Sequence, residues 1–226
     1  MPIRLVDIVL MFVLAFLFIV VFAFFAVLTF GPAVFEFESW HTVTLLVLAQ
    51  CIFMIISIWA IAIFRRGATW ENLGIRKAST RWYKIAVPIG IATQAVTMAI
   101  TIVTVKLFSW HADQYIMTTA IRESHGWIQT ITVLVTITII GPIAEELEYR
   151  SLLYGWLRLH MLPSWSAIIS AACFSITHGV SVRSFSIFLI GLVLAWTYER
   201  SGSIFPGMII HGACNATAYA VIRVLR

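Results

Sequence analysis

The sequence predicts an all-α membrane protein, a polytopic bundle of about seven (six to eight) transmembrane helices. Hydrophobic residues make up 61% of the chain and charged residues only 11%, whereas a soluble domain carries about 25% charged residues. The mean hydropathy of +0.98 agrees with this excess. Apolar runs of about 20 residues, the length that crosses a bilayer as a helix, recur along the chain. Because lipid offers the backbone no hydrogen bonds, each run is expected to be helical.

Seven apolar runs give the expected spans in order. They cover residues 8–30, 42–64, 85–107, 127–157, 164–181, 184–198 and 203–222. The first ends at Gly31 and Pro32, and the second stops at Arg65 and Arg66. The fourth, taken as one helix, is about 45 Å long at 1.5 Å per residue. A polar loop is expected at 108–126, and the whole chain, 1–226, is expected to be a single membrane domain.

The basic residues do not indicate a nucleic-acid partner, although the net charge is +5. They form no basic face with exposed aromatics, and many lie in the one loop 65–84 between two apolar runs. Such clustering is typical of a cytoplasmic loop, and the distribution of bases over the other loops favours a cytoplasmic N-terminus. We therefore expect a lipid bilayer around the chain and no nucleic acid.

A charged segment interrupts the fourth span. Glu145, Glu146, Glu148 and Arg150 follow one another closely, and each costs about 2.5–3.5 kcal/mol at the centre of a membrane helix on insertion scales. Glu146 and Arg150, four residues apart, are expected to pair on one face. Glu145 lies about 100° around the helix and stays free for another task. The alternative is a helix that ends at Pro142, with the charges in a cytoplasmic loop.

Two later spans carry polar residues at helical spacing. Phe174 and His178 share a face of the fifth span, and His211 and Asn215 share a face of the seventh. A lone histidine in a membrane helix commonly makes one interhelical hydrogen bond. Two histidines, an asparagine and a glutamate pair on three separate spans favour a common polar site over separate packing contacts.

These side chains suit peptide hydrolysis, which needs an activated water, a proton for the leaving amine and donors for the oxyanion. Glu145 is the candidate base that deprotonates the water, and His178 the group that orients the water or passes on its proton. His211 and Asn215 are candidate oxyanion donors. This chemistry requires no cofactor.

Two other chemistries remain as alternatives. Glu145, His178 and His211 could instead form the two-histidine, one-carboxylate set of a catalytic zinc site. The sequence has no H-E-x-x-H helix, and Asn215 fits a hydrogen-bond donor better than a zinc ligand, so we favour the metal-free route. A nucleophilic serine near His178 lacks the motif that accompanies such serines.

Taken together, the three motifs resemble those of the CPBP family, the CAAX-prenyl-protease and bacteriocin-processing group that is also called Abi. The resemblance covers about residues 70–216, with a family-like catalytic core at about 127–222. It implies an all-helical membrane fold whose motif helices enclose a cavity open to the cytoplasm. It also implies Glu145 and His178 as the water-activating pair and His211 and Asn215 as oxyanion donors, with Glu146 and Arg150 as support.

Two residues depart from the family pattern. Ser151 stands where the family usually has glycine, and we expect it to loosen close helix packing. Glu148 stands where the family usually has an apolar residue, and it is a candidate contact for a basic substrate. The family's known substrates include prenylated CAAX tails, bacteriocin leaders and membrane-anchored sorting signals.

The resemblance thus predicts an intramembrane protease that acts on a membrane-associated protein or peptide in a prokaryotic cytoplasmic membrane. A second hypothesis is a non-enzymatic membrane protein, such as a bacteriocin-immunity factor or a scaffold, that uses the polar cluster for packing or partner binding. A small transporter with the carboxylates as a proton relay is a third, but the chain shows no paired broken helices.

Overall fold

The computed structural model describes residues 2–31, 40–108 and 116–225, and this part of the chain is helical without any strand. Its helices have the following bounds. They are α1 (Leu5–Phe30), α2 (Trp40–Ile58), α3 (Thr80–Phe108), α4 (Ile116–Glu123), α5 (Trp127–Val135), α6 (Gly141–Glu145), α7 (Gly155–Leu157), α8 (Pro163–Thr177), α9 (Ser184–Ser201) and α10 (Ile204–Val224), with the π-helical segments η2 (Trp59–Arg65), η3 (Thr136–Ile140) and η4 (Glu146–Tyr154). The all-α class is confirmed.

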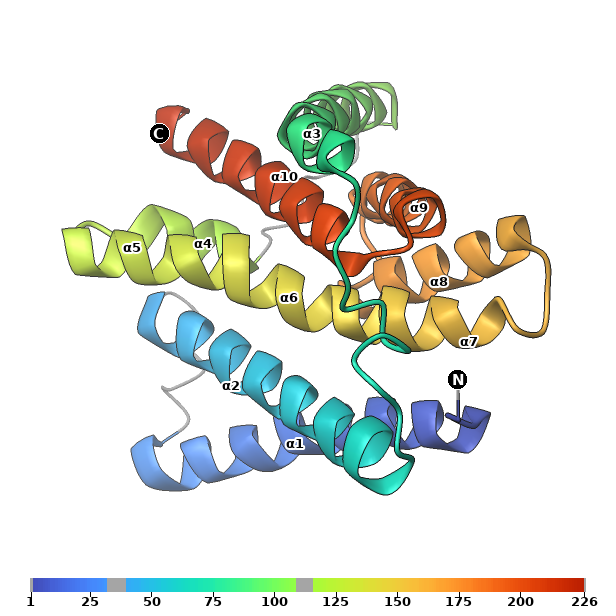
Figure 1. Cartoon of the computed structure of the whole chain (residues 1–226). Helices are drawn as coiled ribbons and strands as arrows, with labels where there is room; N and C mark the ends of the chain where they lie inside the picture. The colour runs from blue at the N-terminus through green and yellow to red at the C-terminus, as the bar shows by residue number, and fades with distance from the viewer. Residues whose placement is uncertain (1, 32–39, 109–115, 226) are drawn as a thin grey trace.

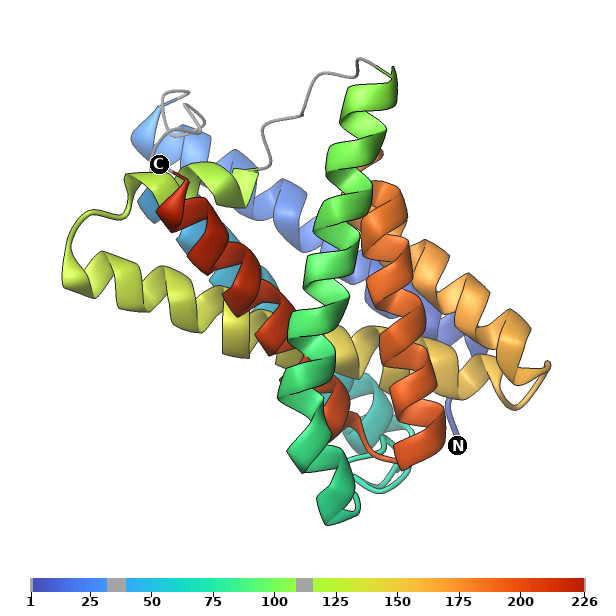
Figure 2. The ribbon, with the colours of Figure 1, turned by 90° about the horizontal axis from the view of Figure 1, so that it is seen from above.

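The helical run from α5 to α7 forms a central rod on which the other helices pack. It is unbroken from residue 127 to 157. Figure 1 shows α1 and α2 on one side of this rod and α3, α9 and α10 on the other. The view from above shows α10 and α3 crossing it side by side (Figure 2), where they contact each other closely. α8 packs between η4 and α9. The charged segment of the rod therefore lies at the centre of the bundle.

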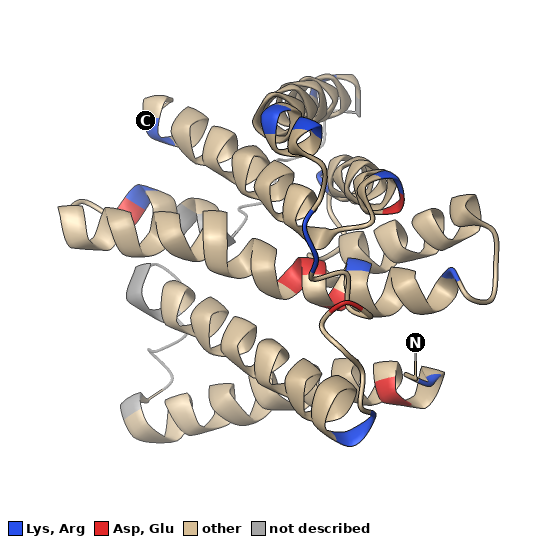
Figure 3. Ribbon diagram, in the orientation of Figure 1, with Lys and Arg blue, Asp and Glu red and all other residues tan. Residues whose placement is uncertain are grey.

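Within the residues that the structure describes, four helices are long and apolar enough to cross a membrane: Leu5–Thr29, Val43–Arg65, Thr80–Leu107 and Trp127–Leu157. Large apolar side chains point outward from them, such as Phe16, which is 66% exposed. Figure 3 shows long stretches of helix that carry no Lys, Arg, Asp or Glu. An apolar exterior of this kind requires lipid as its solvent, so the chain is an integral membrane protein.

The remaining three expected spans are the helices α8, α9 and α10, which are not among these four. α8 has only 15 residues, short of the ~20 that a span needs. It ends at Thr177, before the expected end near 181, because Gly179 turns the chain with a φ of 87°. α8 and α10 supply the histidines and the asparagine of the motifs, and α9 packs against both.

The prediction of a loop at 108–126 is wrong for its second half, where α4 forms; residues 109–115 lie outside the described residues. α4 is amphipathic. Ala120 and Ile121 are buried against neighbouring helices, whereas Arg122 and Glu123 are exposed. Its eight residues reach about 12 Å, too short to appear as an apolar run in the sequence.

The rod continues through Pro142, so the alternative of a helix that ends there is wrong. Proline has no N–H to donate and disturbs the preceding turn. Here the helix widens before it: the N–H of Gly141 bonds to the carbonyl of Thr136, five residues back. This π-helical step leaves the carbonyl of Ile137 available to a partner outside the rod. The rod can therefore carry its charges into the bundle without breaking.

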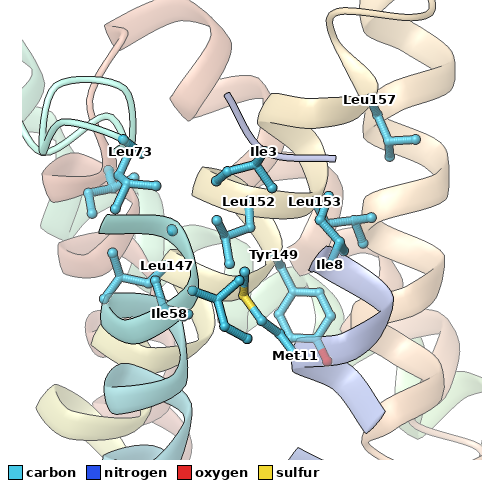
Figure 4. Close-up of a cluster of buried hydrophobic side chains, with 14 of the residues drawn as sticks. Ile3, Ile8, Met11, Ile58, Leu73, Leu147, Tyr149, Leu152, Leu153 and Leu157 are labelled. Atoms are coloured by element: carbon cyan, nitrogen blue, oxygen red, sulfur yellow. The ribbon is translucent and has the colours of Figure 1, made fainter. Parts of the chain in front are cut away.

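A cluster of buried apolar side chains anchors η4 from the side of α1. It joins residues of the chain start, η2 and the loop that follows it to the outer face of η4 (Figure 4). The labelled members are Ile3, Ile8, Met11, Ile58, Leu73, Leu147, Tyr149, Leu152, Leu153 and Leu157. With this face fixed in apolar packing, Glu146 and Arg150 of η4 reach α10 and α9 on the opposite side.

Ser151 adds a polar tie to this anchor. Its hydroxyl donates a hydrogen bond to the carbonyl of Leu73, and its side chain is fully buried. The expectation that serine loosens the packing at this position is therefore wrong: the hydroxyl joins η4 to the loop between η2 and α3. A glycine here would leave that carbonyl without this donor.

We expect Ser151→Ala to lower the free energy of unfolding by roughly 1–3 kcal/mol, because it leaves the buried Leu73 carbonyl without its donor. Denaturant or thermal unfolding in detergent measures the change. Ser166→Ala is the matched control, because the Ser166 hydroxyl is also buried but bonds only to Leu162 at the start of its own helix. Equal stabilities of the two variants would contradict the role assigned to Ser151.

Candidate active site

Glu145 lies where three helices meet. It is the last residue of α6, and its two carboxylate oxygens each face an imidazole from another helix. Oε1 lies 3.7 Å from Nε2 of His178, at the end of α8, and Oε2 lies 3.4 Å from Nε2 of His211, on α10. The structure thus brings together the three side chains to which the sequence assigns water activation and one oxyanion contact.

The end of α8 fixes the position of His178. Its Nδ1 lies 2.8 Å from the carbonyl of Phe174, and its ring packs edge-on against the Phe174 ring at a centroid distance of 4.7 Å. With Nδ1 held by a main-chain acceptor, Nε2 is the nitrogen turned toward Glu145.

His211 is held from behind by a buried ion pair. Its Nδ1 lies 3.2 Å from Oε1 of Glu146, and the same oxygen lies 3.1 Å from Nη1 of Arg150. All three side chains are buried: His211 is 4%, Glu146 1% and Arg150 0% exposed. The expected pairing of Glu146 with Arg150 is therefore present. The same carboxylate oxygen also orients the His211 ring.

Arg150 has two further contacts that keep its charge inside the bundle. Its Nη2 donates to the carbonyl of Gly191 on α9 at 3.3 Å, and its guanidinium lies 4.5 Å from the centre of the Phe174 ring, a cation–π contact. The same ring touches both histidines edge-on. Phe174 thus separates the arginine from the two imidazoles and packs against all three.

Two glycines allow the helices around this cluster to approach each other closely. Sequence reasoning did not single them out. A Cβ atom at Gly207 would lie 2.9 Å from Oε2 of Glu146, and one at Gly191 would lie 2.9 Å from the Cβ of Ala171. Any side chain at Gly207 would push against the carboxylate that orients His211. Nothing in the sequence alone shows which glycine of a span faces which helix.

Asn215 lies on the same face of α10 as His211, as expected, but its contact is with the rod. Its Nδ2 donates to the carbonyl of Ile137 at 2.8 Å, the carbonyl that the π-helical step before Pro142 leaves available. One N–H of the amide therefore fixes α10 to η3. The amide has a second N–H, which remains for the expected oxyanion contact.

Exposure shows from which side the site can be reached. The side chains of Glu145 and His178 are 25% and 19% exposed, whereas His211 is 4% exposed. Glu145 and His178 are therefore the more accessible side chains of the cluster, and His211 with its ion pair is the enclosed part.

The zinc alternative requires that Glu145, His178 and His211 be arranged around one metal ion. In the part of the chain that the structure describes, no group of three or more His, Cys, Asp and Glu side chains is arranged to hold a metal ion. The donor chemistry itself suits zinc, because each histidine has its Nδ1 on an oxygen and its Nε2 turned toward Glu145. Glu145, His178 and His211 therefore offer zinc-type donor atoms, but the described side chains do not form a metal-binding group.

Comparison with known proteins gives one match. Residues 126–217 match the model of a protein family described as Rce1-like, type II CAAX prenyl endopeptidase Rce1-like. The matched segment contains all three motifs, from Glu145 to Asn215. Residues 70–125, to which the sequence resemblance also extended, lie outside it. Searches of curated proteins and of solved structures found no match.

Proposed function

From the match of residues 126–217 to the Rce1-like family of CAAX prenyl endopeptidases, we propose that this chain is an intramembrane endopeptidase of the CPBP family. Its substrates are membrane-associated proteins or peptides, and a water activated by Glu145 and His178 cleaves them. The observation that carries the proposal is the meeting of the Glu145 carboxylate with two imidazoles from separate helices. A polar cluster used for packing alone would not need its acid partly exposed.

The first step is attack by water. A water molecule that lies against Glu145 and His178 loses one proton to the Glu145 carboxylate while its oxygen bonds to the scissile carbonyl carbon. His178, oriented by the Phe174 carbonyl, hydrogen-bonds the same water. When the tetrahedral intermediate collapses, the C–N bond breaks and the proton passes to the leaving amine, by way of Glu145 or His178.

His211 and Asn215 are the proposed oxyanion donors. Nδ1 of His211 lies 3.2 Å from Oε1 of Glu146, so Nε2 is the nitrogen that faces the reacting atoms. Glu146 and Arg150 form the ion pair that fixes this orientation of the ring. The second N–H of Asn215 is the other donor.

We further propose that the reaction needs no metal, and that exhaustive treatment with a zinc chelator leaves the cleavage rate unchanged. Purified protein in detergent, dialysed against chelator and assayed with and without added zinc, measures this. A loss of activity that zinc restores and magnesium does not would instead assign Glu145, His178 and His211 to a zinc site. The control is a zinc-dependent peptidase treated in the same buffer.

We also propose that the protein lies in a prokaryotic cytoplasmic membrane with its N-terminus in the cytoplasm. The orientation rests on the basic loop 65–84 and the positive-inside rule. Reporter fusions to the loop and to both ends of the chain would check the orientation. A loop found on the outer side would reverse it.

A comparison of membrane peptides tests the function. Cells that make the wild-type protein and cells that make Glu145→Gln are compared by mass spectrometry of their membrane fractions. Fragments present only with the wild type identify substrates and cleavage sites. Identical peptide patterns, together with an unchanged cellular phenotype, would favour the non-enzymatic alternative, an immunity factor or scaffold.

A further inference from the structure

Glu148 is a buried acid that the mechanism does not use. It is 5% exposed, and within the described residues it has neither a hydrogen bond nor an ion pair. Its neighbours on the rod differ in this respect, because Glu146 pairs with Arg150 and Glu145 faces two imidazoles. A carboxylate without a partner in apolar surroundings is costly, so a partner from outside the chain would stabilise it.

Among the described residues, the charged group that acts on Glu148 is another acid. Its carboxylate interacts electrostatically with Glu145, three residues back and one turn away, and both acids act on the thiol of Cys51 on α2. Cys51 itself lies in an apolar cluster with Ala15, Met54 and Ala144. The guanidinium of Arg150 interacts with Glu146 and Glu145 instead. A cation beside Glu148 would therefore feel two carboxylates.

The carboxylate of Glu148 can be reached. Some buried side-chain atoms of the described residues, such as Oε2 of Glu146, are fully enclosed and have no hydrogen bond. The oxygens of Glu148 also have no hydrogen bond, but they are not among the fully enclosed atoms. They therefore account for part of the accessible surface of Glu148. Glu148 lies one helical turn from Glu145, whose side chain is 25% exposed.

We propose that Glu148 determines substrate specificity by binding a positively charged side chain, lysine or arginine, next to the scissile bond. The proposal rests on the proposed function, because it places the substrate's reacting carbonyl at Glu145. The cation sits within one helical turn of the water-activating carboxylate, so it belongs to a residue close to the bond that is cut. It supplies the charge that the described chain lacks.

Matched peptides test this inference. Each peptide has an apolar membrane segment followed by a short tail, and the pair differs by lysine or the uncharged norleucine at one tail position, scanned along the tail. We expect the wild type to cleave the best lysine peptide with a kcat/KM at least about tenfold above that of its norleucine partner. In Glu148→Gln this ratio falls to about one. Glu148→Leu, which restores the apolar residue usual in the family, gives the same loss should the glutamine variant fold poorly.

The control is Glu123→Gln, which removes one acid from the exposed face of α4 and should keep the wild-type ratio. Cleavage by the wild type with no preference for lysine at any position would overturn the inference and leave the proposed function standing. A preference that persists in both Glu148 variants would also overturn it.

A binding measurement separates failure of the inference from failure of the proposed function. Fluorescent lysine and norleucine peptides are titrated onto Glu145→Gln and onto Glu145→Gln/Glu148→Gln in detergent. Tighter binding of the lysine peptide that disappears with Glu148 supports the inference, even if the wild type cleaves neither peptide. Equal binding of the two peptides to Glu145→Gln overturns it.

Discussion

Glu145→Gln is expected to lower kcat for peptide cleavage by about 10²–10⁴-fold, the range that general acid–base groups contribute, while the protein stays folded. The amide has nearly the shape of the carboxylate, so it can keep its place between the Nε2 atoms of His178 and His211. It cannot take a proton from water. The loss should therefore appear in kcat rather than in KM.

Purified variants assayed on a substrate identified from the membrane comparison measure this change. Glu123→Gln, which neutralises an exposed acid on α4, serves as the control for charge and expression. Far-UV circular dichroism and gel filtration confirm that Glu145→Gln is folded. Retention of more than about a tenth of the wild-type kcat would mean that Glu145 is not the base.

The sequence predicted the parts of the site that follow from spacing within one helix. Glu146 and Arg150 pair because four residues place them on one face, and Glu145 lies free of that pair for the same reason. The meeting of Glu145 with His178 and His211 was predicted more weakly, from the cost of isolated polar groups in lipid. That cost requires buried polar groups to meet somewhere but does not say how they pair.

Contacts with the main chain could not be predicted. Asn215 binds the Ile137 carbonyl because Pro142 makes the rod widen and frees that carbonyl. Ser151 binds the Leu73 carbonyl because a loop distant in the sequence lies against η4. Both contacts depend on which backbone groups the helix packing leaves unpaired. Sequence spacing predicts which side chains of one helix share a face, but it does not predict which backbone carbonyls stay unpaired.

Burial divides the site into two groups. Glu145 and His178, the front pair, are partly exposed and make few other polar contacts, which suits a pair proposed to exchange protons with water. The rear group, formed by His211, Glu146 and Arg150, is almost fully buried and mutually paired. A substitution at the front should therefore change chemistry, whereas one at the rear should first change stability.

Arg150→Met is accordingly expected to lower the free energy of unfolding by about 3–5 kcal/mol, the cost of removing one partner of a buried ion pair. The methionine fills much of the volume but leaves the Glu146 carboxylate, 1% exposed, without its cation. Reversible unfolding in mixed detergent measures the change. Arg158→Met is the control: its pair with Glu199 is 31% and 35% exposed, and the expected cost is about 0–1 kcal/mol.

The double variant Glu146→Gln/Arg150→Met decides whether the cost comes from the stranded charge. With both charges gone, no buried ion remains unpaired, so the double variant should be more stable than Arg150→Met alone. It should still cleave poorly, because a neutral amide holds Nδ1 of His211 less firmly than the Glu146 carboxylate does. Two single losses that simply add would mean that the ion pair acts through packing rather than charge, and the support assigned to His211 would then fail.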